Sequence, residues 1–275
     1  MPTAAWWKGY YARERASLDL DVLLDAAPDI PFPQAGALVF PHTRLAVSGA
    51  LVAAVAKAAA RAGRDVLTIG VLHGARERDA ELVAKTRAGD PEAIRALRGV
   101  HDESGLASEE FSLDGFRALH ARACAREGAT SRVVARYPFL VGNDPQDLPG
   151  LDDLRRLSRE MLIVATADPV HHGVGYGTTE ALDETRLETW SLARSWIEEQ
   201  LDALARADFS RFLRLCARDR SDFRDAGPVL ATLRPGCVWS IEEMCFVDYA
   251  EVLSSSHPTW VTAGRIRLSP GKQPL

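Results

Sequence analysis

The sequence predicts an α/β fold in which a central, mostly parallel or mixed β-sheet is flanked by helices. Short apolar runs of β type alternate with stretches of helical periodicity along the whole chain. The clearest unit is strand–helix–strand, with apolar runs at 37–41 and 65–72 and a helical stretch at 48–62 between them. No repeat, low-complexity tract or long linker interrupts the pattern. We therefore expect residues 1–275 to form a single domain.

The helices are predicted from periodicity and end signals. An extended piece followed by a short helix is expected over 6–26, before the break at Pro31 to Pro33. Gly63 stops the 48–62 helix, Asp90 and Pro91 open a helix that reaches about Leu97, and Gly128 ends a helix over 114–127. Further helices are predicted at Leu151 to Leu157 and after the capping residue Asp208. The longest is predicted over 182–206, and its buried face is expected to carry Leu187, Trp190, Ile197, Leu201 and Leu204.

The later strands are indicated by further apolar runs. They are expected at Arg132 to Val141, which ends in the turn cluster 142–145, and at Met161 to Ala165. The end of the chain is also strand-like, at Cys245 to Tyr249 and Thr259 to Leu268. Strands that alternate with helices in this way favour a layered α/β sandwich.

Composition excludes several classes of protein. The chain has 275 residues, of which 47% are hydrophobic and 26% charged, and a net charge of −5. A nucleic-acid-binding surface would need a basic face, and a membrane helix would need about 18 consecutive apolar residues; neither is expected. The N-terminus lacks the apolar region of a signal peptide. The four cysteines form no CxxC pair and are expected to be buried thiols of a cytoplasmic protein.

Two histidines follow two strands of the strand–helix–strand unit. His42 comes directly after the first apolar run, and His73 after the second. The run at 161–165 leads to Asp168 and His171. Because open α/β folds build their sites at the carboxyl edge of the sheet, these polar groups predict one metal pocket there. Imidazole is the commonest neutral ligand for iron, copper and zinc.

Each of these residues also has a structural interpretation. His42 or His73 alone fits a polar turn residue, and Asp168 with His171 fits an Asx-type turn with a solvated histidine. The functional interpretation is an acid/base pair in which the carboxylate orients the imidazole. His172 should point elsewhere; His101, His120 and His257 are expected to be surface or packing residues. The glycine spacing at 70–74 supports a nucleotide site only weakly, and no GxSxG or HExxH motif is present.

Five segments, in order, resemble motifs of the MEMO family. The segment Pro41 to Gly49 is similar to PHAGYxYSG, Ile69 to His73 to LGPSH, Tyr137 to Gly142 to IPVLVG, Thr166 to Gly173 to SSDFxHxG, and Trp7 to Tyr11 to an early GxWY segment. Each motif is modest alone, but together they span almost the whole chain.

This resemblance implies a fold like that of the class III extradiol dioxygenases, which open catechol rings with iron(II). It implies metal ligation by His42 and His73. It also implies that His171 corresponds to the acid/base histidine of those dioxygenases, with Asp168 beside it. We expect Asp168 to hold the tautomer of His171.

The chain departs from the family pattern at two positions. Phe111 stands where the family has the histidine of HSIE, and Arg224 where it has a cysteine ligand. The nearby acids Asp222 and Asp225 offer a carboxylate in its place, which would complete the set of two histidines and one carboxylate suited to non-haem iron(II). Asp225 also fits a simple helix N-cap. Cys216 would need a shifted helix end to reach the site.

The leading functional expectation is a metal-dependent oxidoreductase, a non-haem iron(II) dioxygenase-like enzyme that acts on a small phenolic substrate with O2. Copper, zinc and manganese are alternative metals. The alternative functions are a non-catalytic MEMO-type adaptor that binds metal or a peptide, and a metallohydrolase with a zinc-bound water. Pocket residues are expected from the loops 74–90, 102–112 and 174–182.

Overall fold

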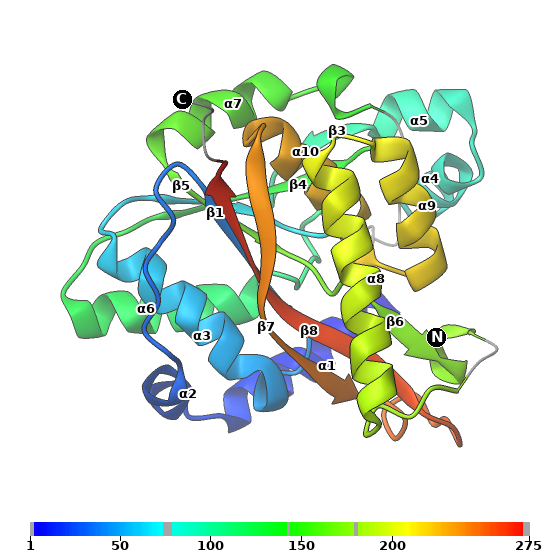
Figure 1. Cartoon of the computed structure of the whole chain (residues 1–275). Helices are drawn as coiled ribbons and strands as arrows, with labels where there is room; N and C mark the ends of the chain where they lie inside the picture. The colour runs from blue at the N-terminus through cyan, green and yellow to red at the C-terminus, as the bar shows by residue number, and fades with distance from the viewer. Residues whose placement is uncertain (1–2, 74–78, 142–143, 179–180, 272–275) are drawn as a thin grey trace.

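Parallel strands form the centre of one mixed sheet, and antiparallel strands extend it on both sides (Figure 1). The computed structural model describes residues 3–73, 79–141, 144–178 and 181–271. The sheet order is β3-β4-β2-β5-β1-β8-β6, and β7 pairs with β8. The strands are β1 (Ala37–Phe40), β2 (Val66–Ile69), β3 (Gly99–His101), β4 (Val133–Phe139), β5 (Leu162–Thr166), β6 (His171–Gly173), β7 (Cys237–Asp248) and β8 (Thr259–Pro270). The predicted α/β class with a mixed sheet is confirmed.

Helices cover both faces of this sheet (Figure 1). They are α1 (Ala4–Ser17), α2 (Leu20–Ala26), α3 (Leu45–Arg61), α4 (Ala80–Arg87), α5 (Pro91–Leu97), α6 (Asp114–Glu127), α7 (Leu151–Glu160), α8 (Leu187–Ala205), α9 (Phe209–Asp219) and α10 (Ala226–Leu233). Alternate residues of β1 enter two cores. Leu38 and Phe40 pack with α3 and α6, whereas Ala37 and Val39 pack with α7, α8 and α10.

Several predicted helix boundaries are confirmed. The helix α6 covers 114–127, and Gly128 ends it in the left-handed conformation with φ 63°. The Asp90 side chain accepts hydrogen bonds from Glu92 N and Ala93 N at the start of α5, and Asp208 caps α9. These boundaries depend on local capping chemistry, which is why they are predictable from sequence.

Two predictions about helices are wrong. The expected extended piece near residue 6 is helical, because Thr3 caps α1 and Glu14 fastens it by accepting a hydrogen bond from Leu45 N (2.9 Å). The helix α8 begins at Leu187, not at 182, and the Leu187 side chain is 76% exposed, so it is not part of the buried face. In the turn cluster 142–145, residues 142 and 143 lie outside the described residues, as does part of the loop 74–90.

The structure also bears on two expectations drawn from composition, the lack of a membrane-spanning helix and the state of the cysteines. Within the described ranges, no helix has both the length and the hydrophobicity that a bilayer span requires. Cys124, Cys216 and Cys237 are buried free thiols as expected, whereas Cys245 is a free thiol that is only half-buried.

Candidate metal centre

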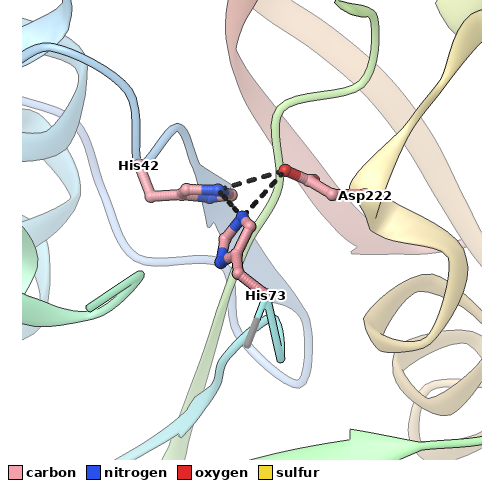
Figure 2. A group of neighbouring side chains, drawn as sticks. All are labelled: His42, His73 and Asp222. Atoms are coloured by element: carbon pink, nitrogen blue, oxygen red, sulfur yellow. Dashed lines mark hydrogen bonds and ion pairs between the residues drawn. The ribbon is translucent and has the colours of Figure 1, made fainter. Parts of the chain in front are cut away.

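The parallel strands bring three polar residues to one edge of the sheet. Strand β5 lies between β1 and β2, and all three run in the same direction. His42 follows β1, Asp168 follows β5 and His73 follows β2. The carboxyl ends of parallel strands meet at the same edge, so the two histidines flank the end of β5. The side chains of His42 and His73 meet there, with their Nε2 atoms 3.0 Å apart (Figure 2).

Hydrogen bonds fix the orientation of the His42 ring. Thr166, the last residue of β5, donates its hydroxyl hydrogen to the carbonyl of Phe40 (2.9 Å). Its Oγ1 can therefore accept a hydrogen bond from Nδ1 of His42 at 3.0 Å. The backbone N–H of His42 donates to Oδ1 of Asp168 (3.2 Å). This arrangement leaves Nε2 of His42 facing the other imidazole.

Glu110 fixes the orientation of the His73 ring. Oε1 of this buried carboxylate lies 3.0 Å from Nδ1 of His73, and Oε2 accepts a hydrogen bond from the His73 backbone N–H at 2.6 Å. Oε1 also accepts the backbone N–H groups of Phe111 and Ser112. The Phe111 ring stacks on the His73 ring, with centroids 4.8 Å apart. Glu110 was not named as a site residue, but it lies in the loop 102–112 that was expected to supply pocket residues, directly before Phe111.

Asp222 supplies the third group of the cluster. It lies in a short 3-10 turn, η4 (Asp222–Arg224), between α9 and α10. Its Oδ1 accepts the backbone N–H of Asp168 (2.9 Å), while its Oδ2 lies 3.1 Å from Nε2 of His42 and 3.6 Å from Nε2 of His73 (Figure 2). Oδ2 is buried and accepts no hydrogen bond from any residue in the described ranges. A buried carboxylate oxygen without a hydrogen bond is costly unless a cation satisfies it.

His171 lies beside this cluster, on β6. Its Nε2 is 3.9 Å from Oδ2 of Asp222, and its Nδ1 lies 2.9 Å from the carbonyl of Arg220. The predicted role of Asp168 as the group that holds the tautomer of His171 is therefore wrong, because a backbone carbonyl takes that position. Asp168 instead orients His42, with Oδ2 3.6 Å from Nε2 of that ring. Asp168, His171 and Asp222 form a second group of potential ligand atoms that shares Asp222 with the first.

The other candidates for the third ligand lie elsewhere. Oδ1 of Asp225 accepts the backbone N–H of Leu140 (2.8 Å), and its Oδ2 lies 3.5 Å from Nε of Arg224. Asp225 occupies the N-cap position of α10 but makes no side-chain capping hydrogen bond. Cys216 is buried in the hydrophobic core, and burial raises the pKa of its thiol. Neither residue belongs to a described cluster of potential ligands.

The remaining histidines lie outside the cluster in the described part of the chain. His172 is buried and stacks on Trp260, with centroids 4.8 Å apart. His101 contacts the carbonyl of Leu97 through Nε2, and His120 is buried against Phe116 in α6. These contacts agree with the packing roles expected for them.

The charges of the metal-free cluster stabilise protons on the two imidazoles. Burial lowers the pKa of His42, but the charges of Asp168 and Asp222 outweigh burial and raise it. Burial also lowers the pKa of His73, but the charge of Glu110 and the contact with Asp222 raise it to about 10. Burial raises the pKa of Asp222, yet the positive charges of the imidazoles hold it well below its usual range. Positive charge is therefore favoured between these three side chains.

At His171 and Asp168 the pKa shifts have the opposite sign: the pKa of the imidazole is lowered and that of the carboxyl group is raised. Burial lowers the pKa of His171 to about 4, so this imidazole is neutral at neutral pH. Burial raises the pKa of Asp168 to about 7, even though the charge of His42 opposes the change. A neutral imidazole that can accept a proton therefore lies next to a carboxyl group that titrates near neutrality.

The cluster fits a divalent metal ion. Adjacent ligand atoms around an octahedral ion with bonds of about 2.1 Å lie roughly 3.0 Å apart. The two Nε2 atoms and Oδ2 of Asp222 are separated by 3.0, 3.1 and 3.6 Å. Each Nδ1 is directed to an oxygen atom, which leaves the Nε2 lone pairs for a cation. Two imidazoles and one carboxylate are the facial set typical of non-haem iron(II) oxygenases.

Metal affinity should rise with pH. In the metal-free protein His73 carries a proton that must leave before Nε2 can bind a metal, so higher pH favours the metal-bound state. We expect about a tenfold gain in apparent affinity per pH unit for each proton displaced, between about pH 6 and 8. A competition titration across this range, corrected for the chelator's own protonation, measures the slope. A pH-independent affinity would contradict the assignment of His73.

Replacing Glu110 with glutamine should weaken metal binding. The amide keeps one acceptor for Nδ1 of His73 but loses the charge and the second acceptor for the backbone N–H groups. Loss of such an orienting partner typically costs 10–100-fold in metal affinity, so a fall of about that size is expected in a chelator competition. Glu109→Gln, which changes an exposed acid one residue earlier, is the matched control. Equal affinities for both variants would rule out the orienting role.

Comparison of the chain with known protein families and with curated protein sequences finds no match. The resemblance of five segments to MEMO motifs therefore remains a prediction.

Proposed function

We propose that this chain is a metal-dependent oxidoreductase: a non-haem iron(II), dioxygenase-like enzyme of MEMO type that acts on a small phenolic substrate with O2. The observation that carries the proposal is the convergence of Nε2 of His42, Nε2 of His73 and the unsatisfied Oδ2 of Asp222. This donor set suits iron(II) and leaves open positions for substrate and oxygen. Manganese, zinc and copper are competing occupants.

In this proposal, His42, His73 and Asp222 hold the metal. Bound iron(II) would supply one-electron redox chemistry and coordination positions for a phenolate oxygen and O2. Glu110 and Thr166 hold the two imidazoles with their Nε2 atoms directed inward. The protein thus fixes the orientation of both imidazoles before a metal binds.

His171 is the proposed proton acceptor. Its Nδ1–H donates to the Arg220 carbonyl, so the lone pair of its neutral imidazole is on Nε2, on the side of Asp222. A phenolic hydroxyl placed near the centre could transfer its proton to this nitrogen. Asp168, whose pKa is raised to about 7, is the second proton-exchanging group at the same edge. Its charge also acts directly on His42.

The proposal includes the cellular location of the protein and its partners. We assign the protein to the cytoplasm because its four cysteines are all free, as is typical of reducing compartments. The partners proposed are the small phenolic substrate and O2, with no role for nucleic acid.

Oxygen consumption by iron-loaded protein tests the function. The protein is loaded with iron(II) without oxygen, and oxygen uptake is followed with a panel of catechols and other phenols. The expected result is substrate-dependent uptake that is lost in His42→Ala and kept in Asp225→Asn. Tight iron binding without uptake for any phenol would favour the adaptor alternative. Hydrolysis of an ester by the zinc form, without oxygen uptake, would favour the hydrolase.

A further inference from the structure

A ladder of aromatic rings runs from the candidate metal centre to the protein surface. The His73 ring stacks on Phe111 (centroids 4.8 Å, interplanar angle 18°), and Phe111 stacks on Tyr11 (5.3 Å, 29°). Tyr11 in turn stacks on Trp7 (5.6 Å, 21°). Trp7 contacts Trp6 edge to face (4.9 Å). The Trp6 side chain is 40% exposed, so the last ring of the ladder reaches solvent.

A second branch joins the ladder from the other side of the centre. The His171 ring contacts Tyr176 (centroids 4.9 Å), Tyr176 contacts Tyr249 (6.4 Å), and Tyr249 contacts Trp7 (5.7 Å). Both branches therefore meet at Trp7. The first ring of each branch is a histidine of the candidate site, and the shared outer rings belong to α1.

The helix α1 is placed to carry these rings. Residues of a helix three and four positions apart lie on the same face, which brings Trp7, Tyr10 and Tyr11 together. Tyr10 stacks on Trp6 at 5.3 Å. No residue of α1 is fully buried, so its aromatic side chains lie between the interior and solvent. Tryptophan and tyrosine are also the side chains that are most readily oxidised by one electron among those with rings.

Tyr11 has a hydrogen-bond path for its proton. Its hydroxyl lies 2.7 Å from the hydroxyl of Tyr249, which contacts Oγ1 of Thr43 at 2.5 Å. Thr43 directly follows His42 in the chain. A phenol can lose an electron at an accessible potential only if its proton can move at the same time, and this network gives it a partner.

We propose that this ladder carries single electrons from the surface to the metal centre, so that the protein clears oxidising equivalents that substrate does not consume. The proposal rests on the proposed function, because it needs a redox-active metal held by His42, His73 and Asp222. Its oxidant is hydrogen peroxide, the two-electron product that an oxygen-using site releases when catalysis fails.

The electrons and protons of the step balance. Reduction of hydrogen peroxide to two water molecules takes two electrons and two protons. A bound iron(II) would supply one of these electrons. Tyr11 gives the other through Phe111 and His73, while its O–H bond breaks and its proton leaves through Tyr249; solvent supplies the second proton. Two electrons then return one at a time through Trp6 and Trp7, one to Tyr11 together with a proton and one to the metal. Two thiol molecules in solution supply these two electrons and two protons and couple to one disulfide, so that one peroxide and two thiols give two waters and one disulfide.

Peroxide mixing with rapid freezing tests the ladder. Iron(II)-loaded protein is mixed with one equivalent of hydrogen peroxide, organic radicals are measured by electron paramagnetic resonance, and oxidised residues are mapped by peptide mass spectrometry. The variants are Tyr11→Phe and Trp7→Phe, which keep an aromatic ring at each position. The matched control is Trp190→Phe, whose ring packs against Phe246 away from the ladder.

The wild type should show a tyrosyl radical and oxidation at Trp6. In Trp7→Phe the tyrosyl radical should last several-fold longer and Trp6 oxidation should fall several-fold. In Tyr11→Phe the Tyr11 radical should be absent, and the radical and the oxidation should move to Tyr176 and Tyr249 of the second branch. Trp190→Phe should match the wild type.

The experiment distinguishes failure of the ladder proposal from failure of the proposed function. If iron binds with the expected dependence on His42 and peroxide is consumed, but no radical or oxidation appears on the ladder rings, the ladder proposal is overturned and the metal site stands. Unchanged Trp6 oxidation in the double variant Trp7→Phe and Tyr10→Phe, which also interrupts the Tyr11–Tyr10–Trp6 contacts, overturns it equally. If iron does not bind at all, the proposed function fails and the ladder proposal fails with it.

Discussion

Replacing either His42 or His73 with alanine should abolish binding of a divalent metal. The wild-type chain should bind one ion, and each variant should bind none at the same concentrations. Each substitution removes one of the two Nε2 atoms that converge at 3.0 Å and leaves a single imidazole with the Asp222 carboxylate. Metal analysis of protein purified without chelators and a titration with iron(II) or manganese(II) measure the outcome. Full stoichiometry and unchanged affinity in both variants would refute the metal site.

The third ligand can be tested in the same titration with two neighbouring acids. Asp222→Asn should lose most of the affinity, because a neutral amide replaces the unsatisfied buried carboxylate oxygen. Asp225→Asn should bind like the wild type, because the amide oxygen can still accept the backbone N–H of Leu140. Circular dichroism melts of both variants check that each remains folded. The reverse order of affinities would transfer the ligand role to Asp225.

The edge of the sheet at which the site lies was predictable from sequence, because the direction of the strands determines where their carboxyl ends lie. Two apolar runs with a helical segment between them imply parallel strands, and the residues after such strands must meet at one edge. His42 and His73 therefore lie at the same edge, but their contact also depends on the loops that carry them across the end of β5, which lies between β1 and β2. The same logic placed Asp168 at this edge, but it says nothing about which atom the carboxylate contacts.

The choice between Asp222 and Asp225 was beyond sequence reasoning. Both acids precede α10, and they differ in direction only because the chain makes a 3-10 turn that Ser221 stabilises by accepting the backbone N–H of Phe223. The turn directs Asp222 toward the imidazoles and leaves Asp225 to bind the end of β4 at Leu140.

Two other features left little sequence signal. Glu110 lies 37 residues from His73 in the chain, in a segment without regular structure, so only the tertiary fold brings them together. The partner of His171 is a backbone carbonyl, that of Arg220. Any residue type supplies a carbonyl, so the tautomer of His171 could not be deduced from the side chains around it.

His171→Ala should keep the metal and lose most turnover. The imidazole is 3.9 Å from Oδ2 of Asp222 and lies outside the group formed by His42, His73 and Asp222, so the ligand set survives its removal. Because burial lowers the pKa of His171 to about 4, the wild-type ring is neutral near neutral pH and its Nε2 lone pair is free. Loss of such a group typically costs about 10²–10⁴-fold in rate.

The measurements that decide this are steady-state oxygen uptake with the best phenol of the panel and metal affinity by competition, with His257→Ala as an exposed control. A proton-accepting role also predicts the sign of the pH effect. Wild-type activity should fall as pH drops toward about 4, where His171 becomes protonated, and the residual activity of His171→Ala should lack that dependence. If the variant loses the metal, His171 is a ligand and the proposed set is incomplete. If it keeps full activity, the proton must go to another group, and Asp168, with its pKa raised to about 7, is the one within reach of the same centre.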